Sequence, residues 1–321
     1  MRLAVVVGLF VASFALAQSN LSIATGGTGG VYYPVGGAYA ELVNTYLDGY
    51  AAVAEVTGAS VENVGLIARG DSDIALALAD TVFQAYAGTG RFGPDGDPGV
   101  QLPNLRALGS AYTNANHIVT LEGSGISSLQ DLAGKRVSVG APGSGTEVSA
   151  AAILGAVGLS YDDIEEQFLN FNESTEALQD GQIDAAFLSV GPPTSSLLSL
   201  AETRDINLVS LSEDEVQAAL DADPTFTPYT ISGGSYKGQD EDVTTIGTPN
   251  VIIVADEMDE ELAYNLTSAL YEHIDEVIAV HPSAEETTPE FSLGSSPIPL
   301  HPGALRYYEE AGYEVPEALR P

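Results

Sequence analysis

A short apolar strand that ends in a glycine-rich turn and runs directly into a helix occurs twice in this sequence, and no other feature limits the fold as much. The first copy covers residues 21–46, with four glycines in the turn at 26–30. The second copy begins at residue 136, and its helix opens with Ser144-x-x-Glu147, a capping-box pattern. Each copy starts its own series of strands and amphipathic helices, which is typical of α/β units around a largely parallel sheet. The sequence therefore predicts an α/β fold with two lobes facing a common cleft.

The two series set the expected lobe boundaries. We expect the first lobe to comprise residues 18–113 and 249–321, and the second to comprise residues 114–248. The Gly-, Pro- and Asp-rich loop at 88–103 is expected on the surface. The tail from residue 292 is expected to pack on the first lobe. Other strands are predicted at 51–56, 74–78, 183–188 and 251–254, and a long amphipathic helix at 260–280.

The N-terminus has the pattern of a cleaved export signal. Met1-Arg2 supplies a minimal basic region, residues 3–16 are almost all apolar, and small residues precede a cut expected after Ala17. A membrane anchor is the alternative, but the run is short for a bilayer and polar residues follow at once. The protein is therefore expected to be secreted or periplasmic. Because it has no cysteine, it is expected to lack disulfides, thiolate chemistry and a lipid-attached N-terminal cysteine.

The chain is strongly acidic. It has 45 acidic and 10 basic residues and a formal charge of −35, which argues against nucleic acid as a partner because phosphates would be repelled. Adaptation to high salt accounts for such acidity, since screening tolerates self-repulsion. A compositional bias of the source lineage is the alternative.

The first glycine-rich turn carries the candidate ligand residues Thr28, Gly29 and Tyr32. Glycine lets a backbone come close to a ligand, and the free N–H groups of a helix start favour negative charge. Tyr32 offers a hydroxyl or a flat wall. A purely structural turn is the alternative, but four glycines with threonine and tyrosine at a strand end favour ligand binding.

The second turn supplies Ser144, Gly145 and Thr146 by the same reasoning. Ser144 is expected to cap its helix, whether or not it also touches a ligand. Both turns lie beyond the carboxyl ends of strands, where open α/β sheets bind ligands. Two such helix starts facing each other would hold a carboxylate without an arginine.

Four further side chains are candidates with an equal or stronger structural alternative. Asn63 and Asp80 lie just past strand ends, where Asp80 would suit an ammonium group, but capping or solvation accounts for them equally well. Arg69 and Arg91 could each pair with a ligand carboxylate. In so acidic a chain, surface ion pairing is the simpler explanation for both arginines.

Enzyme motifs fail, so no catalytic residue, metal or cofactor is expected. The first turn does not complete G-x-G-x-x-G, and the second has Glu147 where a phosphate loop needs lysine. A G-x-S-x-G serine elbow is missing. The histidines, which show no metal-ligand spacing, are His117, His273, His281 and His301.

Residues 24–37, Ala-Thr-Gly-Gly-Thr-Gly-Gly-Val-Tyr-Tyr-Pro-Val-Gly-Gly, closely resemble the opening of the TAXI family, the solute-binding receptors of TRAP-type secondary transporters. The likeness continues at 86–92, at 132–147 and at 301–308. It implies a periplasmic-binding-protein type II-like fold with a hinge, an inter-lobe ligand cleft and a separate membrane permease driven by an ion gradient. Ligands of the family include dicarboxylates and amino acids such as glutamate.

Mapped on this chain, the family's cleft falls on Thr28, Gly29, Tyr32, Asn63, Asp80, Ser144, Gly145 and Thr146. One departure is Leu78, where related sequences often have glutamine. The expected protein is thus a monomeric, non-enzymatic receptor for a small organic anion or amino acid. A module that serves a sensory partner is the alternative, and a hydrolase on the same fold has no motif in its favour.

Overall fold

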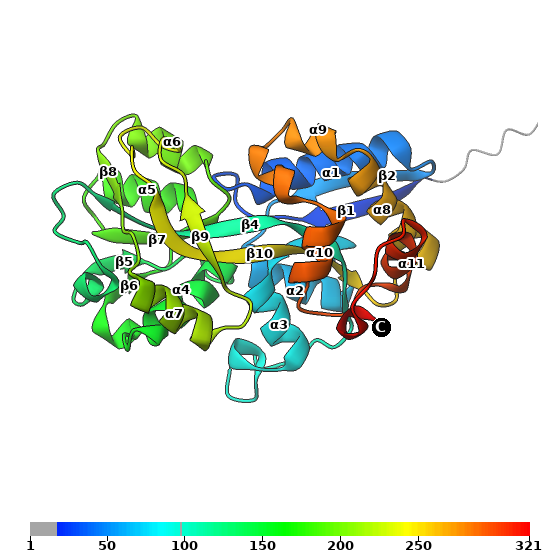
Figure 1. Ribbon diagram of the computed structural model, residues 1–321, viewed down its shortest axis with the longest axis horizontal. Coiled ribbons are helices and arrows are strands. Elements are labelled where there is room, and N and C mark those ends of the chain that lie inside the picture. The colour runs from blue at the N-terminus through cyan, green and yellow to red at the C-terminus, as the bar shows by residue number, and fades with distance from the viewer. Residues whose placement is uncertain (1–17, 97) are drawn as a thin grey trace, which may run out of the picture.

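The computed structural model describes residues 18–96 and 98–321, so the signal peptide predicted at 1–17 lies outside the described residues. Two α/β halves lie side by side and are joined by two long strands (Figure 1). The first half contains β1–β3, α1–α3 and α8–α11, and the second half contains β5–β9 and α4–α7. The strands are β1 (Ser19–Ala24), β2 (Tyr50–Glu55), β3 (Ile74–Leu78), β4 (Leu105–Leu121), β5 (Arg136–Ser138), β6 (Glu165–Gln167), β7 (Ala185–Val190), β8 (Ile206–Leu208), β9 (Thr227–Ile231) and β10 (Val243–Ala255).

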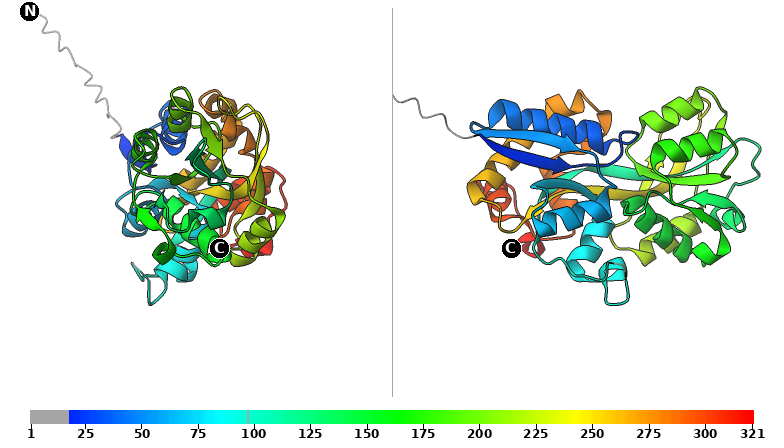
Figure 2. Two further views of the ribbon diagram at one scale, coloured as in Figure 1. Left: turned by 90° about the vertical axis from the view of Figure 1, so that its left-hand side faces the viewer. Right: turned by 180° about the vertical axis from the view of Figure 1, so that it is seen from behind.

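Helices cover both sides of the strands in each half, as the reverse view in Figure 2 also shows. In the first half, α1, α8 and α9 lie on one side, and α2 and α3 on the other. In the second half, α5 and α6 lie opposite α4 and α7. The helices are α1 (Tyr32–Tyr46), α2 (Ser60–Arg69), α3 (Ala79–Ala87), α4 (Gly145–Ala156), α5 (Phe171–Gln179), α6 (Ser195–Ala201), α7 (Glu213–Ala222), α8 (Glu260–Glu272), α9 (Ile274–Ile278), α10 (Pro289–Ser295) and α11 (Pro302–Glu310). Single 3-10 turns lie at Gly90–Phe92, Leu129–Leu132, Tyr161–Asp163, Pro282–Glu286 and Glu317–Leu319.

The ten described strands form one sheet in the order β2-β1-β3-β10-β4-β7-β5-β6, with β8 beside β4 and β9 beside β10. The outer strands pair in parallel, β1 with β2 and β3, and β5 with β6 and β7. The two central strands are antiparallel to each other and to their neighbours β3 and β7. The expectation of a largely parallel sheet is therefore right for the outer part of each half and wrong for the centre.

The central strands β4 and β10 were largely not predicted from the sequence. β4 has 17 residues and is buried along nearly its whole length, and β10 has 13 residues where only 251–254 was predicted. Both contain polar residues among apolar ones, so neither reads as a simple strand. Their polar side chains bond to one another across the sheet, which removes the cost of burying them.

The starts of helices α4 and α2 differ in how they are capped. Ser144 caps α4, because its Oγ accepts the Glu147 backbone N–H at 3.2 Å, as predicted. Ser60 does not cap α2. Ala59, with φ of 77°, precedes α2, and the Ser60 Oγ instead accepts the backbone N–H of Leu78 at 3.0 Å.

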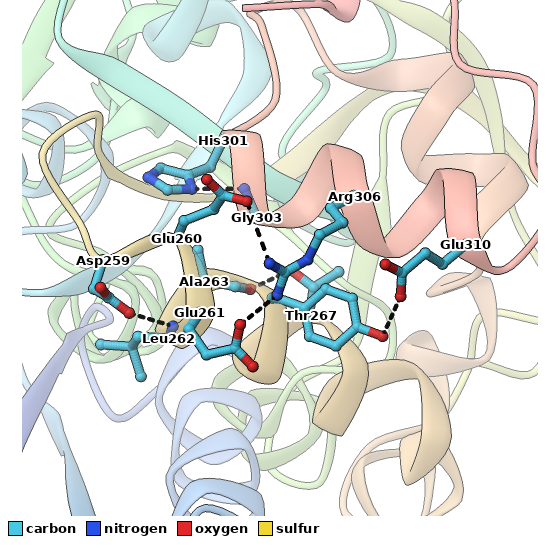
Figure 3. Close-up of polar contacts among 11 residues, drawn as sticks. Asp259, Glu260, Glu261, Leu262, Ala263, Thr267, His301, Gly303, Arg306 and Glu310 are labelled. Carbon is cyan, nitrogen blue, oxygen red and sulfur yellow. Dashed lines mark hydrogen bonds and ion pairs between the residues drawn. The ribbon is translucent and has the colours of Figure 1, made fainter.

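The C-terminal tail packs on the first half, as expected, with α11 lying against α8. Figure 3 shows Arg306 between Glu260 and Glu261, at 3.3 and 2.6 Å. His301 caps α11 by accepting the Gly303 backbone N–H on Nδ1, so this histidine has a structural role. The long helix predicted at 260–280 is divided at His273 into α8 and α9. In the described part of the chain, no helix has the length and apolarity to span a membrane.

Candidate ligand-binding cleft

A cavity of about 330 Å³ lies where the two glycine-rich turns meet. This volume is at the small end of the range for ligand pockets, which suits a small solute. Both halves contribute to the wall. The lining residues are Gly26, Gly27, Thr28, Gly29, Gly30, Val31, Tyr32, Val56, Thr57, Gly58, Ala59, Ser60, Leu78, Asn114, Ala141, Ser144, Gly145, Thr146, Asn170, Phe171, Asn172, Ser189 and Val190.

Four helices begin on this wall: α1 and α2 from the first half, and α4 and α5 from the second. Each helix start leaves backbone N–H groups without a partner inside the helix. Four positive dipole ends thus converge on one small space. The sequence predicts two of them, those of α1 and α4.

The N–H groups of α1, α4 and α5 remain available to a ligand. Within the described part of the chain, no acceptor bonds the backbone N–H of Tyr32, Gly145, Thr146, Phe171 or Asn172. All five residues line the cavity, so an anion placed there meets donors from three helices.

The start of α2 is used differently. The backbone N–H groups of Val61 and Glu62 both donate to the Gly143 carbonyl oxygen, at 3.1 and 3.2 Å. Because Gly143 belongs to the second half, this helix start holds the two halves together.

Neutral polar side chains from the central strands bond to one another beside the cavity. Tyr32 donates its hydroxyl to Asn250 Oδ1 at 2.5 Å, and Asn250 Nδ2 donates to Asn114 Oδ1 at 2.9 Å. Asn114 Nδ2 in turn donates to the Ser189 carbonyl oxygen at 2.8 Å. Burial raises the pKa of Tyr32 far above its usual value, so the phenol is neutral. The network fixes Tyr32, Asn114 and Ser189 in the wall without adding charge.

Six of the predicted residues come together on the wall: Thr28, Gly29, Tyr32, Ser144, Gly145 and Thr146. Thr146 is the most informative of them. Its side chain is almost fully buried, at 3% exposure, and its hydroxyl makes no hydrogen bond to any described residue. A hydroxyl on a cavity wall without a protein partner is open to a ligand or water contact.

Asn63 and Asp80 do not line the cavity, contrary to expectation. Both are fully buried. Asn63 Nδ2 donates to the carbonyl oxygens of Thr25 and Leu76, both at 2.7 Å, and so ties β1 to β3. Asp80 accepts the Ser149 hydroxyl at 2.6 Å, and its location in the protein interior raises its pKa to about 7.

The two arginines do not reach the cavity either. Arg69 is exposed and pairs with Asp71 at 2.8 Å, the surface pairing offered as the simpler explanation. Arg91 pairs with Glu147 of α4 at 2.9 Å, across the two halves. No lysine, arginine, histidine, aspartate or glutamate appears among the described lining residues.

Several lining residues were not predicted from the sequence. Asn114 and Ser189 lie on strands β4 and β7, with no motif to mark them. The start of α5 did carry a signal, because Asn170-x-x-Glu173 forms a complete capping box. That pattern could have identified a third helix start after a strand.

Close contact between the halves explains two of the motif glycines. A Cβ on Gly29 would lie 2.3 Å from Asn172 Oδ1 of α5. A Cβ on Gly145 would lie 2.6 Å from Ser60 Oγ and 2.7 Å from Leu78 Cδ1. These glycines let the halves approach each other as well as a ligand.

Two α/β halves, a shared central strand pair and a cavity between them define a periplasmic-binding-protein type II-like fold. Solved structures support this class. PhnD1 from Prochlorococcus marinus (MIT 9301), in complex with methylphosphonate, matches with a TM-score of 0.53 at 10% identity, over 83% of this chain and 90% of that one. A putative L-cystine ABC transporter protein from Listeria monocytogenes matches with a TM-score of 0.50 at 13% identity, over 85% and 98%. A protein from Bordetella bronchiseptica RB50 matches with a TM-score of 0.54 at 17% identity, over 94% and 92%.

The sequence itself places the chain in one family. Residues 23–312 match the NMT1-like family, and the chain belongs to it.

Proposed function

We propose that this protein is an extracytoplasmic solute-binding receptor that captures a small organic anion between two lobes and delivers it to a membrane permease. The observation that carries the proposal is the set of helix starts with free N–H groups around a cavity that has no charged side chain among its described residues. Membership of the NMT1-like family and the type II-like fold support it.

The lobes of this proposal are residues 18–113 with 249–321, and residues 114–248. The boundaries fall inside β4 and β10, the two strands that pass between the halves. Export with cleavage after Ala17 and action as a monomer belong to the same proposal. Chemistry on the ligand has no part in it.

The permease that we propose is of the TRAP type, on the resemblance of residues 24–37 to the TAXI receptors. Uptake by the reconstituted receptor and permease should then follow an imposed ion gradient without ATP. Uptake that requires ATP hydrolysis would show that the partner belongs to a different transporter class.

Thermal unfolding with a panel of carboxylates, sulfonates, phosphonates and neutral sugars tests the ligand class. A ligand at 100 times its Kd should stabilise the protein by about 2.7 kcal/mol. Native mass spectrometry of the purified protein should find an anion of matching mass. Stabilisation by neutral sugars alone would contradict the proposal.

Thr146→Val provides the matched variant, because valine keeps the shape of threonine and removes a hydroxyl that has no described protein partner. We expect it to weaken anion binding with little change in the free energy of unfolding. Ser144→Ala serves as the contrast. It removes the cap of α4 and should cost about 1 kcal/mol of stability.

A further inference from the structure

We infer that the cavity selects an organic anion that carries no ammonium group: a carboxylate, sulfonate or phosphonate with an uncharged, largely apolar body. This inference rests on the proposed function and narrows it. It sets amino acids such as glutamate apart from their amine-free counterparts.

The described wall of the cavity has no countercharge for an ammonium group. An ammonium group bound in a closed site needs a carboxylate or several free acceptors to replace its water. No lining residue that the structure describes has a carboxylate. The groups facing the solute are glycines, hydroxyls, amides, one phenol and apolar side chains.

Four carboxylates close to the wall along the chain are already engaged, whereas Glu55, next to Val56, is exposed. Glu62 accepts the Gly58 backbone N–H at 2.6 Å, and Glu173 accepts that of Asn170 at 2.9 Å. Glu147 pairs with Arg91, and Asp80 accepts the Ser149 hydroxyl. An ammonium group would have to compete with these partners.

The helix starts also give the cavity a positive local field. Helix starts repel a cation as strongly as they attract an anion, and α1, α4 and α5 all present theirs to the cavity. Two neutral acceptors that could have bonded an ammonium group already have partners. Asn114 Oδ1 accepts from Asn250, and Asn170 Oδ1 accepts the Glu173 backbone N–H. The field therefore favours the anionic head and disfavours the α-ammonium of a zwitterion.

Part of the cavity wall is apolar. Val31, Leu78 and Val190 are buried at 3, 2 and 2% exposure, and Val56 and Phe171 complete the surface. Apolar contacts of this kind suit an aliphatic body and do not compensate a second polar charge.

Matched ligand pairs test the inference by calorimetry with the wild-type protein. The pairs are glutarate and glutamate, 4-methylpentanoate and leucine, and ethanesulfonate and taurine, which differ only by the amine. We expect the amine-free member of each pair that binds to have a Kd at least tenfold lower. Equal or tighter binding of the amine-bearing members overturns the inference and leaves the proposed receptor function intact. If no organic anion binds at all, the proposed function fails and the inference fails with it.

A variant pair tests the cause. Val56→Asp places a carboxylate on the wall at a position that is 57% exposed, so the fold should tolerate it. It should reduce the preference for the amine-free member at least threefold. Val53→Asp adds the same charge at a 59% exposed position that does not line the cavity, and it should leave the preference unchanged. Equal effects of the two variants would mean that overall charge, not the cavity wall, sets the preference.

Discussion

Ser149 Oγ donates a 2.6 Å hydrogen bond to Asp80 Oδ2, and this single bond joins helix α4 of the second half to helix α3 of the first. Both side chains have no exposed surface. Asp80 also accepts the backbone N–H of Thr81 at 2.5 Å. Burial nevertheless raises the pKa of Asp80 to about 7, although both hydrogen bonds favour the charged form.

Asp80→Asn should change how stability depends on pH. The folded pKa of Asp80 is about 7 and its ordinary value is 3.8, so its contribution is fully present below pH 3.8 and is lost as pH rises toward 7. The loss is on the order of 4 kcal/mol at most. Relative to wild type, the variant should therefore gain about 1.4 kcal/mol per pH unit across this window. Urea unfolding at pH 4.5, 5.5 and 6.5 measures the difference, and a flat difference would contradict the prediction.

His117→Gln should show the opposite slope. His117 Nδ1 donates toward the carbonyl oxygens of Ala115 and Leu188, which leaves Nε2 to accept the Tyr236 hydroxyl at 2.9 Å. Burial lowers its pKa from 6.5 to about 4, so stability is lost as pH falls through this range. Relative to wild type, the variant should lose about 1.4 kcal/mol per pH unit as pH rises from 4 to 6.5. A difference of constant size would show that His117 is not held neutral.

Gly145→Ala should separate lobe closure from stability. The added Cβ would meet Ser60 and Leu78 of the other half, so we expect at least a tenfold loss of ligand affinity. Alanine favours the helix, so the free energy of unfolding without ligand should not fall. Gly155→Ala is the matched control on the same helix, because its Cβ meets nothing within 4 Å. Calorimetry and urea unfolding of both variants give the comparison, and equal affinities would refute the closure argument.

Tyr32→Phe should destabilise the protein by about 1–3 kcal/mol, because Asn250 Oδ1 loses its buried hydroxyl donor. The neighbouring Tyr33 is 38% exposed and makes no side-chain hydrogen bond to a described residue. Tyr33→Phe is therefore expected to change stability by less than about 0.5 kcal/mol. Thermal unfolding of the two variants tests the network, and similar effects would argue against it.

Added salt should stabilise the protein if its charge of −35 is an adaptation to high salt. Screening weakens self-repulsion between exposed carboxylates, and the Debye length falls from about 10 Å at 0.1 M to about 3 Å at 1 M. We expect the melting temperature to rise steadily from 0.05 to 1 M NaCl. A steady fall over this range would count against halophily.

The sequence predicts the outer parts of the fold and the two glycine-rich turns, because local physics determines both. A glycine run between a strand and a helix strongly favours a tight turn. The six turn residues do meet at one cavity. β4 and β10 could not be predicted in the same way. Their buried polar residues, such as Asn114 and Asn250, are satisfied by partners 75 to 218 positions away along the chain.

Asn63 and Asp80 show the same limit of sequence-based prediction, because both were expected at the ligand site. A polar residue after a strand is equally consistent with a ligand contact and with an internal bond. Only the fold shows that Asn63 faces the carbonyls of β1 and β3, and that Asp80 meets Ser149, 69 positions later.

The position of β10 has a consequence for the order in which the chain acquires structure. β10 lies between β3 and β4, yet it is the last strand in the sequence. The sheet of the first half therefore stays open along its middle until residues 243–255 arrive, however early β1, β2 and β3 are synthesised. Long-range pairing of this kind makes folding slow. Under the export that we propose, this delay keeps the core from closing before most of the protein has been made.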